Sequence, residues 1–121
     1  MKTLDSYIAG ARFREQQRQE KLHQKWQRGG AIAEACVNLL KGEFGCTQVM
    51  LFGSMQNASE IDERSDIDLL VWGLLGDRYL RALGKLLAIA APEFQVDLVR
   101  IEEAPDWLLE IAASEKDGKF L

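Results

Sequence analysis

Two aspartates separated by one residue, Asp66 and Asp68, open an apolar run, DIDLLVW. Side chains alternate between the two faces of a strand, so both carboxylates are expected on one face and Ile67 and Leu69 on the other. Adjacent like charges raise each other's pKa unless a cation relieves them, and Mg²⁺ prefers such oxygen ligands. A third carboxylate, Asp97, stands in a separate apolar run, QVDLV. The pattern indicates a magnesium site, and the alternative is a pair of solvent-facing turn carboxylates.

A Gly-Ser pair, Gly53 and Ser54, directly follows another apolar run, TQVMLF. Glycine has no Cβ, so the backbone there can approach a ligand closely. A serine hydroxyl and N–H at the start of a helix suit a phosphate, although serine also caps helices without any ligand. A strand, a Gly-Ser pair and then paired aspartates together predict a site for a nucleoside triphosphate.

Three segments in this order, LFGSM, SDIDLLV and VDLV, resemble the DNA polymerase β-type nucleotidyltransferase superfamily. The short length and the EEAP and GKFL segments are similar to the minimal nucleotidyltransferases, the antitoxin partners of HEPN-domain toxins. The resemblance covers roughly residues 31–121. It implies transfer of a nucleoside monophosphate, AMP from ATP, to a hydroxyl group, with two Mg²⁺ ions as cofactors and release of pyrophosphate. The acceptor it implies is a protein partner, a HEPN-like toxin.

The resemblance also implies a role for each matching residue. Gly53 and Ser54 would hold the β- and γ-phosphates, and Asp66 and Asp68 would ligate both metal ions. Asp97 would ligate the catalytic ion and help to deprotonate the attacking hydroxyl. Two metal ions that clamp the attacking and leaving oxygens suit an in-line displacement at phosphorus.

The segment after the Gly-Ser pair departs from the family pattern. The family has small and basic residues there, whereas this chain continues with Met55, Gln56 and Asn57. Three acidic residues then precede the paired aspartates: Glu60, Asp62 and Glu63. An acidic loop repels a triphosphate, so weakened or altered nucleotide binding is expected. Three arginines are candidates to offset this charge: Arg64, Arg78 and Arg100.

Two classes of function therefore stay open. The first is a nucleotidyltransferase that modifies a protein partner, which the complete set of aspartates favours. The second is a catalytically degenerate module that neutralises a partner by contact, which the acidic loop favours. A third option, transfer to a small hydroxylated molecule, requires an acceptor pocket that one short chain lacks and a homodimer would supply.

The spacing of apolar residues and the positions of glycine and proline predict the helices and strands that must position these residues. A helix is expected from about residue 3 to 28, where Gly29 and Gly30 end it, and a buried helix over 31–41. Strands are expected at 47–53, 66–72 and 94–101, with helices at 77–91 and after Pro105 and an edge strand at the GKFL end. The predicted fold is α+β, a small mixed sheet with helices packed on one side and a long N-terminal helical arm. The predicted division is an arm, 1–28, and a nucleotidyltransferase domain, 29–121.

Charge is unevenly distributed along the 121 residues. Residues 1–28 carry seven bases and three acids, net +4, and the remainder carries eight bases and sixteen acids, net −8. The arm is therefore expected either to fold onto the acidic body or to meet an acidic partner, a second copy included. The overall charge of −4 argues against general nucleic-acid binding.

Composition sets further limits. The chain is 47% hydrophobic and 28% charged, as in one ordinary globular domain. No apolar run is long enough to span a membrane or to act as a secretory signal, so a cytoplasmic protein is expected. The two cysteines, Cys36 and Cys46, have no metal-ligand spacing and are expected to be reduced packing residues.

Overall fold

The computed structural model describes residues 3–114 and 116–121. It begins with one long helix, α1 (Leu4–Glu43), whose N-terminus is capped by the Thr3 hydroxyl, which accepts a hydrogen bond from the N–H of Ser6 at 3.2 Å. The predicted break at Gly29 and Gly30 is wrong, because α1 continues through both residues. Neither glycine has a positive φ.

The reason that a glycine stands at position 29 is close packing. A Cβ on Gly29 would overlap the methyl group of Met55 and would lie 3.2 Å from Cζ of Phe94. Nothing lies within 4 Å of a Cβ on Gly30. Glycine costs only about 1 kcal/mol relative to alanine inside a helix. Good helix formers on both sides and packing against the body are sufficient to carry the helix through.

Four strands form one mixed sheet. They are β1 (Gln48–Phe52), β2 (Ile67–Trp72), β3 (Val96–Arg100) and β4 (Gly118–Phe120), in the spatial order β3-β2-β1-β4. β1 is antiparallel to β2 and β4, and β2 is parallel to β3. The α+β fold with a small mixed sheet is thus confirmed, and the GKFL end does supply an edge strand.

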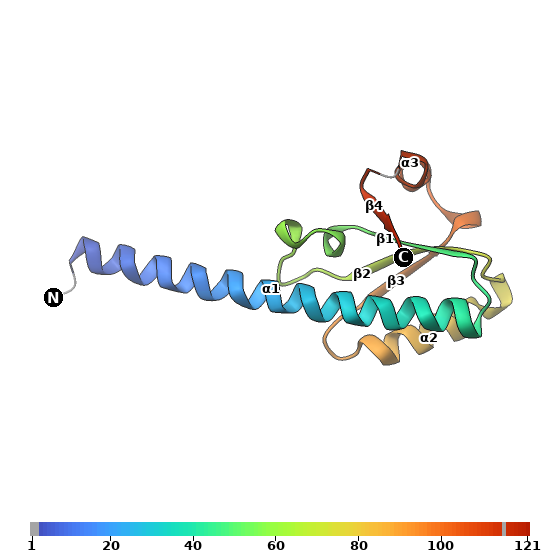
Figure 1. Cartoon of the computed structure of the whole chain (residues 1–121), viewed down its shortest axis with the longest axis horizontal. Helices are drawn as coiled ribbons and strands as arrows, with labels where there is room; N and C mark the ends of the chain where they lie inside the picture. Colours follow the sequence, from blue (N-terminus) through green and yellow to red (C-terminus); the bar gives the residue numbers. More distant parts are fainter. Residues whose placement is uncertain (1–2, 115) are drawn as a thin grey trace.

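The helices lie on both faces of this sheet (Figure 1). α1 and α2 (Tyr79–Ala90) cover one face, as expected, and their core joins Leu40 and Leu86 to Val49 and Leu69 of the sheet. The short α3 (Asp106–Ser114) covers part of the opposite face, where Leu108 packs with Met50 and Leu70 among others. The expectation of helices on one side thus applies to the two longer helices, and α3 lies on the other face.

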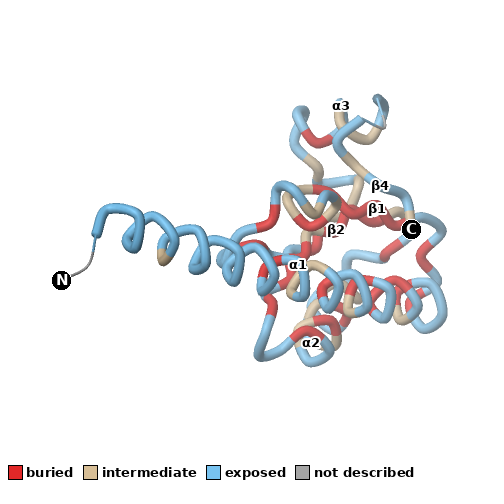
Figure 2. Tube along the Cα trace, turned by 60° about the vertical axis from the view of Figure 1, so that its left-hand side comes forward, coloured by how far each residue is buried: buried red, intermediate tan, exposed pale blue. Residues whose placement is uncertain are grey.

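The first half of α1 extends away from the body (Figures 1 and 2). Leu22 is the first buried residue along the described part of the helix, and Trp26 also packs against the core. The helix therefore begins to contact the body before residue 28. The division into an arm, 1–28, and a domain, 29–121, stays a prediction.

Both cysteines are free and buried, as expected of packing residues. Burial raises the pKa of the Cys36 thiol to about 11. In the part of the chain that the structure describes, no helix is long and apolar enough to cross a membrane.

Candidate active site

The sheet register brings two of the predicted carboxylates together. β2 and β3 are parallel, and Asp68 is the direct partner of Asp97 in the ladder. Their neighbours Ile67 and Leu69 belong to the core beneath α1 and α2. Because successive side chains alternate across a strand, the two aspartates point to the opposite face. The alternation predicted from sequence is therefore confirmed in β2, and the structure adds Asp97 as its lateral neighbour.

The electrostatics of this pair show an unbalanced negative charge. The pKa of Asp68 is raised to about 6, first by burial and then by the negative charges of Asp97 and Asp66. Asp66 is exposed just before β2, and Asp97 is exposed on β3. The three carboxylates thus interact, and a bound cation would relieve the cost of ionising Asp68.

Gly53 brings the backbone against this pair. It has φ 75° and ψ −162° at the end of β1, a conformation that residues with a Cβ rarely adopt. A Cβ on Gly53 would overlap Oδ2 of Asp68. Glycine is therefore required here for two reasons, the positive φ and the close approach to the carboxylate.

Ser54 has a different setting from the one expected. It begins a three-residue 3₁₀ turn rather than an α-helix, and the residue in the N-cap position of that turn is Gly53. The Ser54 hydroxyl donates to Oγ of Ser65 at 2.7 Å. The buried Ser65 Oγ also accepts the N–H of Asp62 at 2.9 Å. Ser65 thus ties the Gly-Ser turn to the residue just before Asp66, a role that sequence reasoning missed although the serine lies in the SDID motif.

A cleft of about 370 Å³ opens beside Asp68. Its lining comes from β1, the 3₁₀ turns, α3 and the C-terminal segment: Phe52, Gly53, Ser54, Gln56, Glu60, Asp68, Trp107, Ile111 and Asp117. Neither Asp66 nor Asp97 lines this cleft. Within the described residues the lining contains three carboxylates and no lysine or arginine.

The arginines proposed to offset the acidic loop lie elsewhere. Arg78 donates to the carbonyl of Glu43 and stacks over the Phe44 ring, 4.8 Å from its centroid. Arg100 donates to the carbonyl of Leu74 at 2.8 Å and pairs with neighbouring glutamates. Arg64 is exposed. None of the three lines the cleft.

The C-terminal part supplies cleft residues that sequence reasoning did not assign to the site. Trp107 is 57% exposed and meets the Phe52 ring edge-on at 6.2 Å. Gln56 donates to the carbonyl of Asp117, which joins the Gly-Ser turn to the segment before β4. No local pattern in the sequence places Trp107 at the site, because none shows that α3 crosses to this face of the sheet.

The donor set suits Mg²⁺ in its chemistry. The aspartates offer hard oxygen ligands, and Mg²⁺ commonly uses one or two carboxylates together with water and substrate phosphates. Among the described residues, no group of three or more acidic, histidine or cysteine side chains is arranged to hold a metal ion. The aspartates therefore form no ready-made three-carboxylate cage, and a substrate's oxygens would have to complete any metal shell.

A mixed sheet with neighbouring aspartates beside a Gly-Ser turn is the arrangement that the sequence predicted for a nucleotidyltransferase. A family model described as "Polymerase beta, Nucleotidyltransferase" matches residues 34–117. The chain belongs to this family.

Solved structures support the same fold. Two mutants of the MntA-HpeT toxin-antitoxin are similar to this chain. One has 24% identity and a TM-score of 0.57, covering 72% of this chain and 69% of that chain. The other has 27% identity and a TM-score of 0.55, covering 74% and 70%. A toxin-antitoxin with AMP-PNP has 25% identity and a TM-score of 0.56, covering 72% and 70%. No curated protein matches the chain.

Proposed function

We propose that this chain is a Mg²⁺-dependent nucleotidyltransferase that moves AMP from ATP to a hydroxyl of a protein partner, a HEPN-type toxin, and so acts as its antitoxin in the cytoplasm. The observation that carries the proposal is the placement of Asp68 beside Asp97, with the Gly53 backbone against Asp68. Membership of the nucleotidyltransferase family supports the reaction class. The similar structures, toxin-antitoxin proteins of which one contains AMP-PNP, support the nucleotide and the kind of partner.

In this mechanism the chain holds the donor and accepts a proton. The turn at Gly53 and Ser54 would bind the β- and γ-phosphates. Asp66 and Asp68 would hold the metal ions, with Asp97 as a further ligand of the catalytic ion. Mg²⁺, when bound, supplies positive charge against the phosphate oxygens. Asp97 accepts the proton of the acceptor hydroxyl, whose oxygen bonds to the α-phosphorus while the bond to the β-phosphate oxygen breaks. Pyrophosphate leaves.

The acidic cleft favours a second candidate. A lining with Glu60, Asp68 and Asp117 and no described cation supplies no side chain that neutralises a triphosphate. All positive charge would then have to come from metal ions or from the partner. If that charge is insufficient, the chain is a degenerate nucleotidyltransferase module that neutralises its partner by contact.

Calorimetric titration of ATP with and without Mg²⁺ separates the two candidates. We expect magnesium-dependent binding to the wild type, its loss in Asp68→Asn, and its retention in Asp77→Asn, a matched change at an exposed residue outside the cleft. ATP labelled at the α-phosphate should then label a co-purified partner. Absence of nucleotide binding by the wild type would overturn the enzyme proposal and favour the contact module.

A further inference from the structure

The segment between the Gly-Ser turn and Asp66 has little structure of its own. It contains two three-residue 3₁₀ turns, Ser54–Gln56 and Ala58–Glu60, and no strand or α-helix. Both of its ends lie at the site, because Ser54 begins it and Ser65 directly precedes Asp66. Holding such a segment in one conformation costs conformational entropy, which contacts from elsewhere must offset. Those contacts come from α1.

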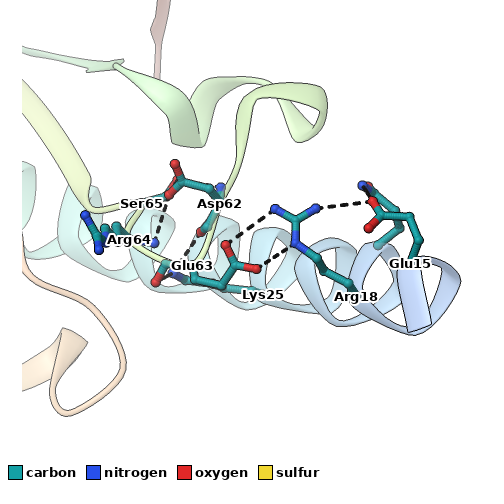
Figure 3. A network of polar contacts seen from close by, with 8 residues as sticks. Glu15, Arg18, Lys25, Asp62, Glu63, Arg64 and Ser65 are labelled. Atoms are coloured by element: carbon teal, nitrogen blue, oxygen red, sulfur yellow. Dashed lines mark hydrogen bonds and ion pairs between the residues drawn. The ribbon is translucent and has the colours of Figure 1, made fainter. Parts of the chain in front are cut away.

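Lys25 attaches the C-terminal end of the segment to α1. Its ammonium group donates to the carbonyls of Asp62 at 3.2 Å and Glu63 at 3.0 Å. The Lys25 side chain thus binds the carbonyls of two successive residues, the second of which lies three positions before Asp66. Figure 3 shows this contact together with Arg18, whose Nε donates to Oε1 of Glu63 at 2.8 Å.

Trp26 and Gly29 attach the N-terminal end. The indole N–H of Trp26 donates to the carbonyl of Met55 at 3.0 Å. The Met55 side chain is 3% exposed, and its methyl group occupies the space that a side chain on Gly29 would need. The residue that directly follows Ser54 is therefore fixed against α1 through both its backbone and its side chain.

Charge also favours contact between the segment and α1. The segment carries Glu60, Asp62 and Glu63 close to the carboxylates of the site, which on its own would increase the repulsion of a triphosphate. Arg18 and Lys25 bring positive charge from the basic part of α1 onto this segment. The sequence left open whether the basic arm folds onto the acidic body or meets an acidic partner. At Arg18 and Lys25 the arm contacts the acidic segment of the body.

We propose that α1 positions the active-site segment 54–65, with Lys25 and Trp26 as positioning residues for nucleotide binding. This inference rests on the proposed function only where the test measures nucleotide binding; the hydrogen-exchange measurement does not depend on it. Lys25 acts through the carbonyls of residues 62 and 63 on the approach to Asp66, and Trp26 acts through Met55 on Ser54. A partner that displaces α1 would therefore shift Ser54 and Asp66, the residues proposed to bind the phosphates and the metal ions.

The test compares Lys25→Met with Lys21→Met. Each variant loses one positive charge from the groove between α1 and Glu63, which both lysines line. Among the described residues, however, only Lys25 of the two donates hydrogen bonds to the segment. We expect Lys25→Met to weaken magnesium-ATP binding about tenfold, as loss of a supporting contact behind a metal ligand does, and to speed hydrogen exchange of the amides of residues 58–65. Lys21→Met should match the wild type, and Lys25→Arg, which keeps charge and donors, should restore both readouts. Trp26→Phe, which keeps an aromatic ring but loses the N–H, should speed exchange near residue 55.

The outcomes separate this inference from the proposed function. Equal exchange in Lys25→Met and Lys21→Met, at equal melting temperatures, overturns the positioning role whether or not ATP binds. Faster exchange in Lys25→Met, with no ATP binding by the wild type, supports the positioning role and overturns the proposed enzyme. If ATP binds the wild type and Lys25→Met with equal affinity, the positioning role in nucleotide binding is overturned.

Discussion

The two adjacent glycines of α1 provide a matched pair of substitutions, Gly29→Ala and Gly30→Ala. Both lie inside the helix, where alanine is favoured over glycine by about 1 kcal/mol. Gly30 is exposed, and a Cβ there meets nothing within 4 Å. We therefore expect Gly30→Ala to raise the free energy of unfolding by about 1 kcal/mol.

Gly29→Ala gains the same helix propensity but must displace a neighbour. Its Cβ would overlap the buried methyl group of Met55 and lie 3.2 Å from Phe94. Inserting an extra methyl group into a packed core costs about 1–3 kcal/mol. The net change for Gly29→Ala is then a loss of up to about 2 kcal/mol. Gly30→Ala should therefore exceed Gly29→Ala in stability by about 1–3 kcal/mol.

Urea unfolding followed by circular dichroism measures this difference directly. The slope of unfolding free energy against urea concentration should be equal for the two variants. Equal slopes would show that the substitutions do not change the surface exposed on unfolding, so that the difference in free energy reports packing in the folded state. If Gly29→Ala is as stable as Gly30→Ala, the contact between the Met55 methyl group and position 29 does not limit the packing there, and this reasoning is refuted.

Three further predictions concern the site and the face of the sheet that α3 covers. In metal-free buffer, the contribution of Asp68 to stability should fall as the pH rises from about 4 through 6, because the folded pKa of Asp68 lies at about 6, above its ordinary value of 3.8. Asp68→Asn should then be more stable than the wild type by about 1–2 kcal/mol at pH 8, since solvent screens part of the charge of this half-buried carboxylate. The gain should disappear at pH 3.5, and a gain independent of pH in urea unfolding would contradict this. Ser65→Ala should cost about 1–3 kcal/mol, because the Asp62 N–H and the Ser54 hydroxyl lose their partner, and an unchanged urea midpoint would show that these groups find others. Leu108→Ala should cost about 2–5 kcal/mol in the same assay, and a cost below about 1 kcal/mol would mean that α3 is not anchored on its face of the sheet.

Local patterns in the sequence predicted the strands and most of the helices. The runs around Met50, Leu70 and Leu98 are apolar and bounded by glycine, polar residues or proline, and each forms a strand. The placement of Asp68 on the face opposite Ile67 and Leu69 follows from the period of two, which any strand imposes. Asp66 lies just before β2, so its place on the same face stays a prediction. The Gly-Ser turn after β1 was likewise visible, since a motif of neighbouring residues needs no knowledge of the rest of the fold. The roles of these residues in catalysis stay predictions.

The tertiary structure decided what depends on residues far apart in the chain. The glycine pair predicts a helix break when only intrinsic preference is known, but α1 continues through it because good helix formers flank the pair and the helix packs against the body; the contact with Met55 explains only why residue 29 is a glycine. The placement of Asp68 beside Asp97 depends on the register of two strands that 23 residues separate. The placement of Trp107 in the cleft depends on α3 crossing to the far face. The attachment of an acidic loop to a basic helix required both segments in space, because charge composition alone does not say which opposite charges meet.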